Sequence, residues 1–166
     1  LKEYRILKQF DDANKLMDSV MGNAKTPGWG AKNIDVLLER IRQLEAQEKY
    51  GNASSQANAL VKQLVTKSAS DNQIKEKYLE AYFHTVYALY KYGLQQTDAA
   101  KKSSYVNNAA TLISNLVNSN PDFGSVDSKK RFDELLASEK ELNDAFEIAK
   151  NRKPAPAATN KGGIKK

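Results

Sequence analysis

Apolar residues recur at steps of three and four along most of the chain, with short polar breaks between the stretches. The stretch 2–21 predicts a first helix, and the segment 22–33, which contains a Pro-Gly pair, predicts a loop. We expect Trp29 to cover the core from this loop, because so large an apolar ring is seldom left in water. No stretch alternates as a strand would, so the sequence predicts an all-α fold. Further helices are predicted over about 34–50, 52–67, 74–92, 99–119 and 127–150.

Glycine, proline and capping residues divide these helices. Gly51 is expected to end the second helix in a left-handed conformation, and Gly93 is expected to end the fourth helix. Ser70 begins a capping-box sequence for the fourth helix, and Asp98 is a candidate cap for the fifth. The segment 120–124 combines proline with glycine and therefore predicts a sharp turn.

Two sequence signatures occur twice, which indicates a repeated two-helix unit. The tripeptide at 49–51 recurs at 91–93 after 42 residues, and the apolar stripe at 57–65 recurs at 109–117 after 52 residues. The difference predicts a ten-residue insertion around 95–104 in the second copy. The alternative is that two unrelated amphipathic hairpins share leucines at helical spacing. Repetition of a hairpin at this length is typical of an α-solenoid, in which each hairpin packs only on its neighbours.

The second copy resembles a tetratricopeptide repeat. Its aromatic-rich first helix ends in Gly93, its second helix carries the small residue Ala109, and Pro121 closes the hairpin at the family's spacing. The resemblance covers about 31–124. It implies an α-α superhelix of about six antiparallel helices, in which the first helices of successive hairpins line a concave groove that holds a peptide.

A second resemblance concerns the setting of the protein. The segment 120–124, leading into 131–136, is similar to the closing part of repeat modules in large bacterial secreted or surface proteins. This resemblance implies a secreted, periplasmic or cell-surface location rather than a cytoplasmic one. The first residue is leucine rather than methionine, which indicates a processed form or a fragment of a longer protein.

The tetratricopeptide resemblance implies that the helices 34–50 and 74–92 line the groove. Phe83, Tyr87 and Tyr90 share one face of their helix, about 100° from the stripe that suits the hairpin core. Tyrosine offers flat apolar area with a hydroxyl at its tip, as recognition surfaces require. The alternative is that both stripes are buried in a compact bundle. The residues expected at the partner surface are Ile41, Glu45, Glu48, Glu80, Phe83, Tyr87, Tyr90 and Lys91.

The net charge of +6 is located at the C-terminal end, which divides the chain into a helical domain, 1–150, and a tail, 151–166. Six basic residues cluster there: Lys150, Arg152, Lys153, Lys161, Lys165 and Lys166. Subtracting these six from the 26 basic residues leaves 20, which equals the 20 acidic residues, so the body is neutral. The tail cannot bury apolar surface. We expect either a solvated extension or an electrostatic tether for a nucleic acid, an anionic surface or a neighbouring subunit.

Few features of the sequence suggest catalysis. The chain contains no cysteine and no nucleotide-binding or metal-binding motif, and His84 is its only histidine. No apolar run approaches the ~20 residues that cross a bilayer. We therefore expect a non-catalytic interaction scaffold that binds a protein or peptide without a cofactor. The alternative is a structural subunit of a large assembly whose basic tail contacts a neighbour, a nucleic acid or an anionic surface.

Overall fold

The computed structural model describes residues 2–22 and 30–152. This part of the chain forms eight α-helices and a short 3-10 helix and contains no strand, which confirms the predicted all-α class. The elements are α1 (Lys2–Ile6), α2 (Phe10–Gly22), α3 (Gly30–Ala46), α4 (Tyr50–Ser68), α5 (Asn72–Leu94), α6 (Ala99–Ser119), η1 (Pro121–Gly124), α7 (Val126–Ser138) and α8 (Lys140–Lys150).

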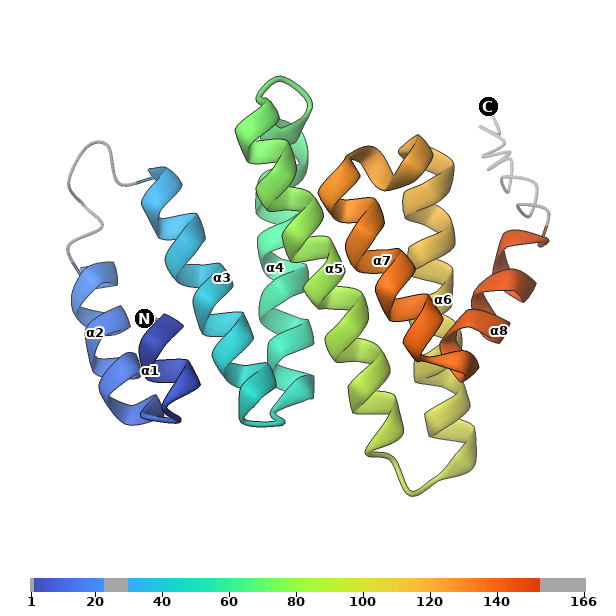
Figure 1. The fold of residues 1–166 in the computed structure, drawn as a ribbon, viewed down its shortest axis with the longest axis horizontal. Coiled ribbons are helices and arrows are strands. Elements are labelled where there is room, and N and C mark those ends of the chain that lie inside the picture. The colour runs from blue at the N-terminus through green and yellow to red at the C-terminus, as the bar shows by residue number, and fades with distance from the viewer. Residues whose placement is uncertain (1, 23–29, 153–166) are drawn as a thin grey trace, which may run out of the picture.

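Consecutive helices run up and down and form an elongated array (Figure 1). The helices α3, α5 and α7 lie in one row, and α4 and α6 lie behind them. The short α1 and α2 pack beside α3 at one end, and α8 packs against α6 at the other. The pairs α3–α4, α5–α6 and α7–α8 are therefore three successive hairpins, and the first helix of each belongs to the same row.

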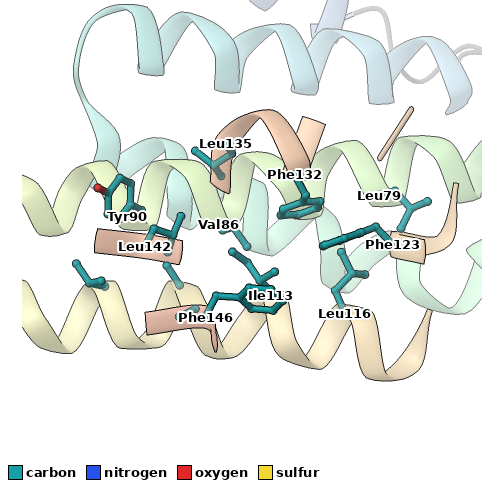
Figure 2. Packing of buried hydrophobic residues seen from close by; sticks show 13 residues of the cluster. Leu79, Val86, Tyr90, Ile113, Leu116, Phe123, Phe132, Leu135, Leu142 and Phe146 are labelled. Carbon is teal, nitrogen blue, oxygen red and sulfur yellow. The ribbon is translucent and has the colours of Figure 1, made fainter. Parts of the chain in front are cut away.

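The larger hydrophobic core lies between α5, α6, α7 and α8 (Figure 2). Phe132 of α7 is fully buried within it. Its ring stacks on Phe123 with the centroids 5.0 Å apart and meets the edge of Phe83 at 5.3 Å. A second core joins α3, α4 and α5 and consists of Ile34, Leu38, Ile41, Ala53, Ala57, Leu60, Leu64, Ala81 and Ala88.

Side-chain caps fix the start of three helices. Asp71 accepts hydrogen bonds from two backbone N–H groups in the first turn of α5, so the cap predicted at Ser70 is wrong by one residue. Asp98 accepts from a backbone N–H of α6, as predicted, and Ser125 accepts one from α7. Each cap satisfies a donor that the helix itself leaves unpaired.

Two helices that the sequence predicts as continuous are broken. The helix predicted over 2–21 is interrupted at Lys8, which has a φ of 57° and separates α1 from α2. The helix predicted over 127–150 is interrupted at Glu139, with φ −119° and ψ 83°, between α7 and α8. Neither break contains a glycine or a proline, the residues from which a break could have been predicted. The loop predicted over 22–33 is also shorter, because α3 already begins at Gly30, and Trp29 lies outside the described residues.

The prediction that Gly51 ends a helix is wrong, whereas Gly93 lies one residue before the end of α5. Gly51 is the second residue of α4, and the turn before α4 contains Glu48, which has a φ of 58°. Gly93 lies within α5 and is buried, and a Cβ at this position would stand 2.7 Å from the Cβ of Tyr105. Gly93 therefore allows α5 and α6 to approach closely.

The repeated tripeptide consequently occupies two different structural positions. At 49–51 it opens α4, the second helix of a hairpin, whereas at 91–93 it lies near the end of α5, a first helix. The predicted insertion over 95–104 is a short link, 95–98, followed by the first turns of α6. The tripeptide therefore does not mark equivalent junctions.

The turn predicted over 120–124 is present as η1 and its flanks. Asp122, Phe123 and Gly124 follow one another with φ values of 53°, 58° and 84°. Only glycine adopts such values without strain. The turn places the ring of Phe123 in the larger core, which provides a packing reason for the strained backbone.

Candidate functional site

A cleft of about 640 Å³ lies on the face formed by α3, α5 and α7, and α1 contributes to one edge of it. Its lining is mixed, because charged side chains surround a short aromatic wall. The lining residues are Lys2, Arg5, Glu39, Arg42, Glu80, Phe83, His84, Tyr87, Arg131, Glu134, Leu135 and Ser138.

The aromatic wall is built from α5, with support from α4. The rings of Phe83 and Tyr87 stack with their centroids 6.1 Å apart, and Tyr50 meets Tyr87 edge-on at 6.3 Å. Phe83 and Tyr87 are half-buried and line the cleft. Burial, reinforced by the neighbouring Tyr50, raises the pKa of Tyr87 to about 12. The Tyr87 hydroxyl therefore stays protonated at neutral pH.

A chain of ion pairs links α1, α3 and α5 across the cleft. The Nε of Arg5 lies 2.8 Å from Oε1 of Glu39, and a guanidinium nitrogen of Arg42 lies 3.0 Å from Oε2 of the same carboxylate. Arg42 also pairs with Glu80. Glu39 is only 6% exposed, so these two guanidinium groups replace the hydrogen bonds that water would otherwise provide. Burial would lower the pKa of Arg42, but Glu80 and Glu39 outweigh burial and raise it.

His84 extends this chain. It is buried, and its Nδ1 lies 2.9 Å and 3.0 Å from the two carboxylate oxygens of Glu45. Its Nε2 lies 4.0 Å from Oε1 of Glu80. The histidine thus stands between two carboxylates from different helices. No cluster of three potential metal ligands occurs within residues 2–22 and 30–152.

Four of the predicted partner residues lie at the cleft. Glu80, Phe83 and Tyr87 line it directly. Glu45 is half-buried and contacts the cleft through His84. The predicted face of α5 therefore does reach this surface.

The other four predicted partner residues are placed differently. Tyr90 is 2% exposed and Ile41 is 1% exposed, so both belong to the hydrophobic cores and offer no surface to a partner. Lys91 pairs with Glu139 at 2.5 Å, at the corner between α7 and α8. Glu48 lies in the turn before α4, where its carbonyl oxygen accepts a hydrogen bond from Gln95, and it does not line the cleft.

Reasoning from the sequence missed four residues that line the cleft: Arg5, Glu39, Arg42 and Arg131. Arg131 of α7 lines the cleft, whereas its neighbours Lys129 and Lys130 pair with carboxylates of their own helix. None of the ion pairs between described residues includes Arg131. Glu39 lies on the same side of α3 as Val36 and Gln43, and the structure buries all three, which the polar character of Glu39 and Gln43 does not indicate.

Most of the predicted basic tail lies outside the described residues. Lys150 ends α8, with its Nζ 5.8 Å from the centroid of the Phe146 ring and 3.8 Å from a carboxylate oxygen of Glu147. Arg152 is exposed. The role predicted for the tail stays a prediction. Within the described ranges, no helix combines the length and the apolar character needed to span a membrane.

The fold and the cleft define an all-α protein of layered helical hairpins with a charged, aromatic-walled cleft on one face. Comparison of the chain with protein-family models, curated proteins and solved structures gave no match. The function proposed below therefore depends on the geometry of the cleft.

Proposed function

We propose that the chain is a non-catalytic interaction module that binds a peptide or protein segment in the cleft between α3, α5 and α7. One observation carries the proposal: an accessible aromatic wall, formed by Phe83 and Tyr87, stands among charged side chains held by ion pairs. Aromatic anchors surrounded by oriented polar groups dominate the binding energy of protein interfaces. Arg131 adds a guanidinium for an acidic or carbonyl group of the partner.

A second part of the proposal concerns the row of first helices. The cleft is formed by the first helices of three hairpins, as the family's concave groove is. The second helices α4 and α6 lie behind this row (Figure 1). We propose that the chain uses its row of first helices in the same general way.

The polar groups of the cleft are engaged in a manner that favours binding over catalysis. His84 is held by the carboxylate of Glu45. The hydroxyl of Ser138 donates to the carbonyl oxygen of Leu135 at 3.0 Å, within its own helix. A nucleophile needs a base within hydrogen-bonding reach, and no such pair is formed by these two residues.

A displayed library of random peptides, selected on the full chain, tests the proposal. We expect the selected peptides to bind Tyr87→Ala and Phe83→Leu at least tenfold more weakly, a loss of about 1.4 kcal/mol or more. Tyr105→Ala is the matched control, because Tyr105 is a half-buried tyrosine on α6 that does not line the cleft. Thermal unfolding of each variant checks that it is folded.

Two results would contradict the proposal. One is a selection in which no peptide is enriched on the folded chain. The other is a set of peptides whose affinity falls equally with Tyr105→Ala and Tyr87→Ala, since such peptides would not use the cleft.

A further inference from the structure

The helix α1 lies at one edge of the cleft, where Lys2 and Arg5 line it. It is five residues long, and a helix this short is not stable alone in water. Ile6 at its end is 63% exposed, and the adjacent Leu7 is 66% exposed. Two cations of α1 reach the cleft: Arg5 pairs with Glu39, and Lys2 lines the edge.

The charges of the cleft explain this position. Apart from α1, the lining residues include the three carboxylates of Glu39, Glu80 and Glu134 and only two guanidinium groups, Arg42 and Arg131. The helix α1 supplies two further cations, Lys2 and Arg5, and so changes an acidic excess into a basic one.

One of the two cations of α1, Arg5, pairs with a particular group of the cleft, the buried carboxylate of Glu39. Glu39 is 6% exposed and has two guanidinium partners, one of which is Arg5. Withdrawal of α1 leaves this buried charge with Arg42 alone, and Arg42 is shared with Glu80. An incoming basic side chain would restore the lost partner.

The connection between α1 and α2 permits such a withdrawal. Lys8, with its φ of 57°, interrupts the helix between them. The helix α2 also packs on α3, and its Ala13 and Met17 are 0% and 1% exposed. A movement of α1 about Lys8 need not break the contacts between α2 and α3.

We infer that α1 occupies the edge of the cleft in the free protein. There it competes for Glu39 with a partner segment that carries an arginine or a lysine. This inference rests on the proposed peptide-binding function and names the chemistry of the partner: a short segment with a basic side chain placed at Glu39. Tethering gives α1 a high effective concentration at the cleft, so the free protein binds such a segment only weakly.

A synthetic peptide of residues 1–9, LKEYRILKQ, serves as the probe, and its counterpart with alanine at the fifth position is the control peptide. We expect the probe to bind the full-length Arg5→Ala variant about tenfold or more tightly than it binds the wild-type chain. The control peptide should bind neither protein. Lys15→Ala is the matched control variant, because Lys15 is a highly exposed cation of α2 that pairs, among the described residues, only with its helix neighbour Asp12.

A second substitution separates competition from simple loosening of the fold. Glu39→Gln added to Arg5→Ala should abolish binding of the probe, because the carboxylate that receives the arginine is gone. Equal binding of the probe to the wild-type and Arg5→Ala chains would overturn the inference. Binding that survives Glu39→Gln would also overturn it.

The library peptides distinguish failure of this inference from failure of the proposed function. If they require Tyr87 but bind wild type and Arg5→Ala with equal affinity, the cleft binds peptides, and the inference about α1 is wrong. If no library peptide is enriched on either protein, while the probe still binds Arg5→Ala through Glu39, the proposed function fails and the internal contact stands.

Discussion

Glu139 links the corner between α7 and α8 to α5 by hydrogen bonds. Its carboxylate accepts a hydrogen bond from the hydroxyl of Tyr90 at 2.9 Å and one from Nζ of Lys91 at 2.5 Å. Burial alone would raise the pKa of Glu139, but the hydrogen bonds from Lys91 and Tyr90 outweigh burial and lower it. The corner is therefore held by an ionised carboxylate, and removing the charge should destabilise the fold.

We expect Glu139→Gln to lower the free energy of unfolding by about 1.5–3 kcal/mol, the usual contribution of a hydrogen bond to a charged group. Tyr90→Phe should cost about 1 kcal/mol, because it removes the donor and leaves Glu139 paired with Lys91. The two costs should not add, since they share one interaction, and a double-mutant cycle should give a coupling of about 0.5–3 kcal/mol. Urea unfolding followed by circular dichroism measures all three values.

The pH dependence provides an independent check. The pKa of Glu139 is lowered in the folded state from an ordinary value of 4.5, so its stabilising contribution is present above that pH. It is lost as the pH falls below 4.5 and through the folded-state pKa. The stability difference between wild type and Glu139→Gln should therefore shrink on acidification. Strict additivity in the cycle, or a difference that stays constant down to about pH 3, would refute this reasoning.

Three further substitutions test the packing, each by urea unfolding. Phe132→Ala should cost about 3–5 kcal/mol, because this fully buried ring is the centre of the larger core. Gly93→Ala should cost about 1–3 kcal/mol, because the new Cβ would stand 2.7 Å from that of Tyr105. Tyr82→Phe should cost about 1 kcal/mol at neutral pH, since it removes the hydrogen bond to the carbonyl oxygen of Leu112. Burial raises the pKa of Tyr82 from 10.0 to about 12, so its contribution is lost as the pH rises over that range, and Tyr82→Phe should reduce this alkaline loss.

The sequence predicts those parts of the fold that local chemistry determines. Helical periodicity identified the helices from α3 to α6, and a capping side chain identified the start of α6 at Asp98. The breaks at Lys8 and Glu139 could not be predicted in this way, because neither residue favours a break by itself. At Glu139 the cause is tertiary, since its side chain bonds to Tyr90 and Lys91 on another helix.

The cleft, too, could be predicted only in part from the sequence. Spacing along α5 correctly placed Phe83, Tyr87 and Tyr90 on one side, but it could not show that the α7–α8 corner covers Tyr90. The ion pairs join residues that are far apart in sequence, 34 positions for Arg5 with Glu39 and 38 for Arg42 with Glu80. Each of these charges alone resembles an ordinary solvated residue, so only the packing of three helices makes them one network.

The distribution of buried charge over the fold supports the cleft as the functional face. The contacts of α4 and α6 with their neighbours are mainly apolar, as the two hydrophobic cores show. The carboxyl groups of Glu39, Glu45 and Glu80 are instead concentrated where α3 and α5 meet the cleft. Apolar side chains of similar volume would hold two helices together at least as well as a buried ion pair does. Stability alone therefore does not account for these charges, whereas the proposed selection of a charged partner at the cleft would.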